Sequence, residues 1–130
     1  MLELASGSVR ATFSELGARL GSVFLDGVDV IAGGGTDEQV QAGEVYAGTV
    51  CGRYAGRITH AKFSLDGREY TLATNMGPHQ LHGGPDNFAL RRWKAEASAK
   101  AIRFSLHSPD GDQGYPGALD VTATYALDGN

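Results

Sequence analysis

Two histidines separated by two residues, His79 and His82, are the first candidates for chemistry in this sequence. An imidazole with its ordinary pKa of about 6.5 can give or take a proton near neutral pH. A zinc site needs three or four ligands, usually with cysteine or carboxylate support. His60 lies elsewhere, the single cysteine, Cys51, is distant, and no third ligand stands at a recognisable spacing. We therefore predict no metal site. We expect either acid–base chemistry or a structural role, with one histidine solvated and the other bonded to backbone.

Arg57 is the second candidate, and it belongs to a run of glycine and apolar residues, GRYAGRI (52–58). The run is predicted to be buried, and a guanidinium placed there needs partners for all of its N–H donors. Arg57 could pair with a carboxylate in the core, or its fork could bind the oxygens of a ligand in a cleft. Composition leaves both interpretations open.

Two other glycine-rich segments could bind a ligand. Gly33-Gly34-Gly35 lacks the Gly-Lys-Ser/Thr ending of a phosphate-binding loop and no helical pattern follows it, so we predict a surface loop. The segment SPDGDQGYPG (108–117) combines turn-forming glycines and prolines with acidic residues. Those acidic residues could bond the hydroxyls of a sugar, but we predict that the segment is structural.

The elements that must position these residues are predicted to be β-strands. Asp26-Gly27 and Asp66-Gly67 predict tight hairpin turns, because both central residues of such a turn need positive φ. The one helix candidate, 93–101, has apolar residues at alternate positions and is predicted to be a strand. Two long polar segments, 75–90 and 108–117, are predicted to be loops, where binding residues tend to lie. The alternation of apolar and polar residues that marks a half-buried strand is clearest at Val9–Phe13, Val23–Leu25, Lys62–Leu65, Glu69–Leu72, Ile102–Leu106 and Leu119–Leu127.

Length and composition agree with a single globular domain. The chain has 130 residues, of which 42% are hydrophobic and 20% charged, so we expect a folded chain rather than wholesale disorder. Its 19 glycines are about twice the usual share, yet they follow no collagen-like repeat. These features are typical of a turn-dense, all-β protein built as an antiparallel sandwich or barrel.

Charge, apolar runs and cysteine content indicate which partners and which cellular location to expect. The net charge is −4, and the densest basic cluster, Arg91-Arg92 with Lys94, is too small for a nucleic-acid footprint. No apolar run approaches the roughly 20 residues of a membrane span. The first residues lack the basic and apolar regions of a secretory signal. A single cysteine excludes an internal disulfide framework. We therefore expect no nucleic-acid partner, no membrane association and a cytoplasmic location; the sequence does not indicate an oligomeric state.

Taken in order, the motifs resemble those of the aldose 1-epimerase (galactose mutarotase) family. The resemblance extends from about residue 8 to the end of the chain, and the matching segments are GRYAGRI (52–58), FSLDGREYTL (63–72), NMGPHQLHGG (75–84), the pair Phe88 and Trp93, and SPDGDQGYPG (108–117). The resemblance implies an antiparallel β-sandwich, the galactose mutarotase-like supersandwich, that interconverts the α and β anomers of free aldoses without a cofactor. Residues 1–130 are then expected to form only the N-terminal part of that sandwich.

The resemblance also implies roles for individual residues. Arg57 matches the family arginine that hydrogen-bonds sugar hydroxyls, and His82 matches the family histidine that contacts the sugar near its ring oxygen. We therefore expect Arg57, Gly56 and His82 to bind substrate, and His82 to be catalytic as a proton or hydrogen-bond donor. Gly56 stands where the family usually has Asn, and Met76 and His79 stand where Asn is common. These departures bear on the sugar preference.

Further catalytic groups of the family have no counterpart in this sequence. The resemblance implies a second histidine, in an Asn-His-x-Tyr-Phe-Asn type motif, together with a sugar-binding aspartate and a basic glutamate, all beyond residue 130. We therefore predict little or no mutarotase activity for the 130 residues alone. Three alternatives stay open: a non-catalytic carbohydrate-binding module, a purely structural sandwich, and an epimerase for a phosphorylated hexose that uses Arg53, Arg91 and Arg92.

Overall fold

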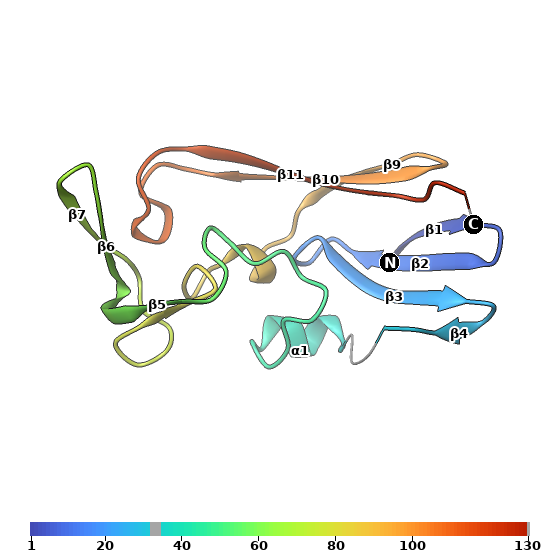
Figure 1. The fold of residues 1–130 in the computed structure, drawn as a ribbon, viewed down its shortest axis with the longest axis horizontal. Helices are drawn as coiled ribbons and strands as arrows, with labels where there is room; N and C mark the ends of the chain where they lie inside the picture. The colour runs from blue at the N-terminus through green and yellow to red at the C-terminus, as the bar shows by residue number, and fades with distance from the viewer. Residues whose placement is uncertain (32–34, 130) are drawn as a thin grey trace.

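The computed structural model describes residues 1–31 and 35–129, and its regular structure is mostly β-strand (Figure 1). The strands are, in chain order, β1 (Leu2–Ser6), β2 (Val9–Ser14), β3 (Arg19–Leu25), β4 (Val28–Asp29), β5 (Arg57–Ile58), β6 (Lys62–Leu65), β7 (Arg68–Thr71), β8 (Gln80–Leu81), β9 (Lys94–Ala97), β10 (Ala101–Ser108) and β11 (Leu119–Ala126). Within the described ranges the helical elements are short, and they are α1 (Asp37–Gln41) and the 3₁₀ turns η1 (Thr59–Ala61), η2 (Phe88–Leu90) and η3 (Asp112–Gly114).

The strands form antiparallel sheets. The larger sheets have the strand orders β1-β2-β3-β4 and β11-β10-β9, and the smaller ones pair β5 with β8 and β6 with β7. In Figure 1 the sheet of β9, β10 and β11 lies above the sheet of β1–β4, while the β6–β7 hairpin lies at the end of the molecule away from β1–β4. The prediction of an all-β antiparallel architecture is confirmed.

The main core lies between the two larger sheets. Phe13 of β2, Phe104 of β10 and Trp93 are each no more than 2% exposed. Tyr125 of β11 packs its ring 4.8 Å from that of Phe13, and its hydroxyl donates to the backbone oxygen of Ala18 at 3.0 Å. Burial of each large apolar side chain contributes about 1.5–3 kcal/mol. These contacts bind the two sheets into a sandwich.

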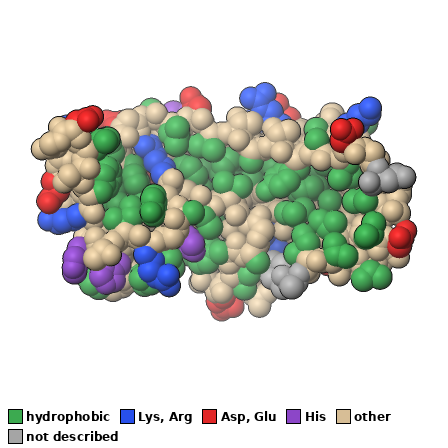
Figure 2. All heavy atoms as spheres, viewed as in Figure 1, with side chains coloured by type: hydrophobic (Ala, Val, Ile, Leu, Met, Phe, Trp, Pro, Cys, Tyr) green, Lys and Arg blue, Asp and Glu red, His purple; other side chains and the backbone are tan. Residues whose placement is uncertain are grey.

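The turns and most strands follow the sequence pattern. Both residues of Asp26-Gly27 and of Asp66-Gly67 have positive φ, as the hairpin prediction requires. In the helix candidate 93–101, residues 94–97 form strand β9, 98–100 form the turn that follows, and Ala101 begins β10, so the strand prediction is confirmed for 94–97. The half-buried hydrophobic residues of β11 pack against the main core. Figure 2 shows hydrophobic side chains along the length of one face of the molecule, with most charged groups toward the rim.

Helix α1 was not expected from the sequence. Thr36 caps it, because its side chain accepts from the Gln39 backbone while the Gln39 side chain accepts from the Thr36 backbone. This capping box is a sequence-readable start signal, although the helix is too short to show periodicity. Arg19 pairs with Asp37 at 2.6 Å and ties α1 to β3. Of the triplet 33–35 predicted to be a surface loop, Gly35 is exposed and the other two lie outside the described residues.

No helix in the described ranges combines the length and the apolar character needed to cross a membrane.

Candidate functional site

The short ladder between β5 and β8 brings the two main candidate motifs together. Arg57 pairs with Leu81 and Ile58 with Gln80. The ladder therefore places the Gly-Arg-Ile triplet beside the Leu-His-Gly-Gly segment, although 25 residues separate Arg57 from His82 along the chain. Of the residues predicted to bind substrate, Arg57 begins β5, Gly56 immediately precedes it, and His82 immediately follows β8.

Gly56 and His82 are linked in both directions. The His82 backbone N–H donates to the Gly56 oxygen at 2.9 Å, and the Gly56 N–H donates to His82 Nδ1 at 3.0 Å. Because Nδ1 accepts a hydrogen bond, we assign the proton of the neutral imidazole to Nε2. Gly56 has φ of 94°, a backbone conformation that glycine adopts most readily. The result is a half-buried histidine whose Nε2–H is a hydrogen-bond donor.

Arg57 is exposed, so the prediction that 52–58 is buried is wrong for most of the segment. Gly52 is its one buried residue, and a Cβ there would lie 2.3 Å from the Phe88 ring. The glycines thus serve close backbone approach and turning rather than burial of the whole run. Arg57 Nε donates to Met76 Sδ at 3.4 Å, and no carboxylate in the described ranges bonds to this guanidinium. The alternative of a core ion pair is therefore wrong.

A cavity of about 530 Å³ lies beside Arg57. We call it the Arg57 pocket; its size is typical of ligand pockets, which span roughly 300–1,000 Å³. The Phe63 ring stacks at 6.1 Å on Tyr115 and at 5.1 Å on Tyr70, which makes one wall aromatic. The full lining is Arg53, Tyr54, Arg57, Ile58, Phe63 and Tyr115.

Tyr115 is a fixed part of that wall. Burial raises the pKa of its hydroxyl to about 12, so the group stays protonated in ordinary conditions. The hydroxyl donates to the side chain of Gln80, which is 1% exposed and in turn donates to the Ala73 oxygen at 2.9 Å. Tyr115 is therefore a hydrogen-bond donor in this structure and not a base.

Arg53 also lines the pocket, but its donors are already used. Its Nε donates to Ser108 Oγ at 2.9 Å, and the terminal nitrogens donate to four backbone oxygens at 2.7–3.1 Å, those of Ser108, Pro109, Pro116 and Gly117. These bonds hold both ends of the segment 108–117 against Arg53. The structural interpretation of that segment is confirmed.

A second arginine holds the middle of the same segment. Arg91 makes two hydrogen bonds to the Asp112 carboxylate, at 2.6 and 2.7 Å, and one to Asp86 at 2.9 Å. The hydrogen bonds from Arg91 lower the pKa of Asp112 to about 2, with a smaller contribution from Ser108. Asp112 is accordingly ionised at neutral pH and hydrogen-bonded to Arg91.

The three arginines considered for a phosphate do not form a common site. Arg53 and Arg91 are bonded to the protein itself, as described above. Arg92 is 71% exposed at its side chain and lies 3.9 Å from Glu15, in a region where α1 rather than β5 is the neighbour. The geometry lends the phosphorylated-hexose alternative no support.

In the described part of the chain, none of the other histidines shares a hydrogen bond or a ring contact with His82. The His60 backbone N–H donates to His79 Nδ1 at 3.0 Å, and the two rings are 5.3 Å apart, so His79 is bonded to backbone. His107 pairs with Asp120 at 2.7 Å on the β10–β11 hairpin. Figure 2 shows histidine side chains gathered near the end where β5 lies. Within residues 1–31 and 35–129, no three His, Cys, Asp or Glu residues gather closely enough to hold a metal ion.

Sequence reasoning missed Tyr46 as a neighbour of His82. The two ring centroids are 4.9 Å apart and the planes are inclined at 51°. A single tyrosine in an irregular segment after α1 carries no periodicity, so no pattern could have pointed to it.

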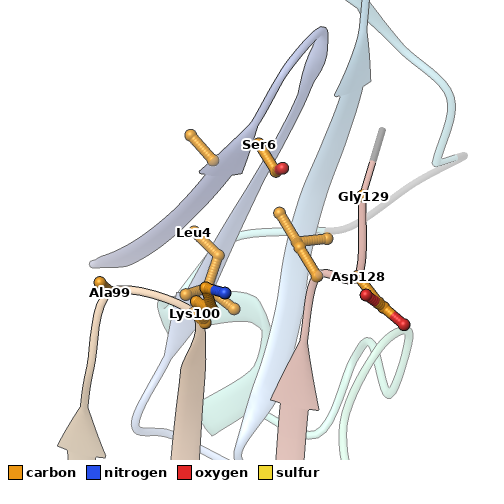
Figure 3. Close-up of a pocket in the computed structure, with 8 residues that line it drawn as sticks. Leu4, Ser6, Ala99, Lys100, Asp128 and Gly129 are labelled. Carbon is orange, nitrogen blue, oxygen red and sulfur yellow. The ribbon is translucent and has the colours of Figure 1, made fainter.

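A different pocket, of about 310 Å³, lies at the far end of the sandwich (Figure 3). It is bounded by β1, the turn between β9 and β10, and the segment after β11. Its charged lining residues are Lys100 and Asp128. It contains none of the motif residues, so we place the candidate site at the Arg57 pocket and His82 instead.

Comparisons with known proteins show which family the chain belongs to. The sequence model of the family described as aldose 1-epimerase matches residues 1–130. A galactose mutarotase of Sus scrofa is 46% identical over 101 residues, which are 78% of this chain and 30% of the relative. An aldose 1-epimerase of Haemophilus influenzae is 51% identical over 86 residues, which are 65% of this chain and 25% of the relative. The chain thus spans about a quarter to a third of the length of these curated relatives.

Solved structures show the same fold. An aldose epimerase homologue from C. elegans superimposes with a TM-score of 0.86 at 30% identity, over 97% of this chain and 41% of that one. A galactose 1-epimerase from Lactobacillus acidophilus superimposes with a TM-score of 0.80 at 27% identity, over 95% of this chain and 38% of that one. These likenesses confirm the mutarotase-like sandwich and, together with the family match over all 130 residues, establish that the chain belongs to the aldose 1-epimerase family.

Proposed function

We propose that this chain supplies the sugar-binding part of an aldose 1-epimerase site for a free aldose such as glucose or galactose. Arg57, Gly56 and His82 are the proposed substrate-binding residues, and His82 is the proposed catalytic one. The observation that carries the proposal is the two-way hydrogen bonding between Gly56 and His82, because it leaves Nε2–H of a neutral imidazole as the donor.

The chemistry follows from the two side chains. Anomer interconversion breaks the C1–O5 bond while the ring oxygen gains a proton and the C1 hydroxyl loses one; rotation about C1–C2 and reclosure give the other anomer. His82 Nε2–H is suited to donate toward the ring oxygen. The Arg57 guanidinium, always protonated, cannot be the base, but its unused N–H groups can orient sugar hydroxyls.

The base and a second acid have no candidate next to these residues. In the described ranges no Asp or Glu side chain bonds to Arg57 or His82. We therefore propose that these groups come from a part of the protein outside the 130 residues, in keeping with the greater length of the relatives. The cytoplasmic location remains a prediction.

Polarimetry with freshly dissolved α-galactose or α-glucose tests the division of roles. We expect the 130-residue chain to change the mutarotation rate little or not at all. A rate near that of a full-length mutarotase would contradict the proposal, because it would place the missing acid and base within these residues.

Calorimetric titration with the same sugars tests the binding role. The Arg57→Ala variant is expected to weaken aldose binding roughly ten-fold or more, since it removes charge-assisted hydrogen bonds. Arg103→Ala is the matched control, because Arg103 is also exposed but lies on β10. Equal affinities for the two variants would refute the assignment of Arg57.

A non-catalytic carbohydrate-binding module is the second candidate. It is favoured by the fact that the available groups of Arg57 and His82 are all donors, which suffices for binding but not for proton removal. Sugar binding that depends on Arg57, without any catalysis in a longer form of the protein, would favour the module.

A further inference from the structure

We propose that Tyr46 is a positioning residue for His82, whose ring it holds so that Nε2–H keeps one direction. The role in sugar recognition rests on the function proposed above, whereas the role in fixing the imidazole does not. The starting observation is that the ring centroids of Tyr46 and His82 are 4.9 Å apart.

Tyr46 is itself anchored to the backbone around it. The backbone carbonyl oxygen of Tyr46 accepts hydrogen bonds from the Thr49 backbone N–H at 3.2 Å and from Thr49 Oγ1 at 2.7 Å, which close a turn. The next residues of this segment are tied to the chain around β3, because Leu20 donates to Gly48 at 3.0 Å and Val50 donates to Gly17 at 2.8 Å. The ring of Tyr46 is thus presented from a segment joined to the larger sheet.

His82 is held from a different direction by Gly56. The single hydrogen bond from Gly56 N–H fixes one atom of the imidazole, Nδ1, but a ring held at one atom can still tilt about that bond. The inclined contact with Tyr46 restricts this tilt, as aromatic pairs at 4.5–7 Å commonly do. Two constraints, one polar and one apolar, together define where Nε2–H lies.

A positioning role for Tyr46 has consequences beyond an effect on stability. A tyrosine that only filled space would affect stability alone, whereas a positioning tyrosine also affects the tautomer and motion of one specific imidazole. The ring nitrogens of His82 therefore provide a readout that a merely structural role would leave unchanged.

The test is NMR on the isotopically labelled 130-residue chain, with long-range proton–nitrogen correlations of the His82 ring and titration with galactose. In the native protein we expect a single Nε2–H tautomer and nuclear Overhauser contacts between the two rings. Tyr46→Phe should retain both, because the ring contact needs no hydroxyl. Tyr46→Leu and Tyr46→Ala should give exchange-broadened or mixed-tautomer signals and about two- to ten-fold weaker galactose binding.

Tyr70→Ala is the matched control, since it removes an aromatic partner of Phe63 and not of His82. Unchanged His82 ring signals in a folded Tyr46→Leu or Tyr46→Ala variant would overturn the proposal, and so would equal changes in Tyr70→Ala. If the small variants fail to fold, the absence of ring–ring contacts in the native protein would overturn it, and their presence with a single tautomer supports it. Absence of galactose binding by the native chain would count against the proposed function, while the ring signals still decide the role of Tyr46.

Discussion

Arg53 and Arg57 occur four residues apart in one motif, yet they lie in regions that the protein uses in opposite ways. In the Arg53 region, every N–H of the guanidinium is bonded to Ser108 or to backbone oxygens of the segment 108–117. In the Arg57 region, the exposed guanidinium has one hydrogen bond within residues 1–31 and 35–129, to a methionine sulfur. The comparison teaches that the same residue type becomes a structural clamp or a ligand-binding group according to which carbonyls the fold brings to it.

The space around the backbone also differs between the two regions: it is smaller near Arg53 than near Arg57. A Cβ on Gly83 would lie 1.9 Å from the oxygen of Gly52, the residue before Arg53. A Cβ on Gly56, the residue before Arg57, would meet its nearest atom at 4.0 Å. The Arg53 region is tightly packed, and the Arg57 region has open space.

Replacing Gly83 and Gly56 by alanine should give the largest difference in stability between the two regions. We expect Gly83→Ala to lower the free energy of unfolding by about 3 kcal/mol or more, because the backbone must move and the left-handed φ becomes strained. Gly56→Ala should cost about 1–2 kcal/mol, because only the φ of 94° is unfavourable there. Urea unfolding of both variants measures the difference. Similar losses would show that the crowding at Gly83 is relieved easily.

Substitutions of Arg53 and Arg57 should give the second-largest difference in stability. Arg53→Met should destabilise by about 2–4 kcal/mol, because it leaves several backbone oxygens of segment 108–117 without their charged donor. Arg57→Met should change stability by less than about 0.5 kcal/mol, as is usual for an exposed side chain. Equilibrium unfolding, with sugar titration of the Arg57 variant, separates the structural from the binding role. A stability loss at Arg57 that matched the loss at Arg53 would contradict the comparison.

Acid should destabilise the packing of segment 108–117, because it protonates Asp112, the partner of Arg91. Its folded-state pKa of about 2 lies below the ordinary value of 3.8, so its contribution to stability is fully present above about pH 4 and is lost as the pH falls toward 2. With its side chain 8% exposed, the contribution is expected to be about 2 kcal/mol. Unfolding measured between pH 5 and 2 should show a smaller pH dependence in Asp112→Asn. Asp86→Asn, the change at the exposed outer partner of Arg91, should keep most of the native pH dependence.

Much of the fold could be predicted because its signals are local. The Asp-Gly turns at 26–27 and 66–67 need positive φ, and alternation marks a buried face of β10 and a half-buried face of β11; both are properties of adjacent residues. Helix α1 was missed because five residues cannot show a helical period. Burial of 52–58 was mispredicted because glycines in close backbone contact resemble an apolar core when only composition is considered.

By itself, the sequence determined the family through the order of its motifs and the β-strands through their period of two residues. The resemblance to the family then implied that Gly56, Arg57 and His82 are the candidate binding residues. Only the tertiary structure decided that Arg53 is a clamp, that His79 bonds to the backbone of His60, and that Tyr46 packs on His82. These pairings join segments distant in sequence, and spacing along the chain cannot encode which carbonyl or ring a side chain will meet once the sheets have formed.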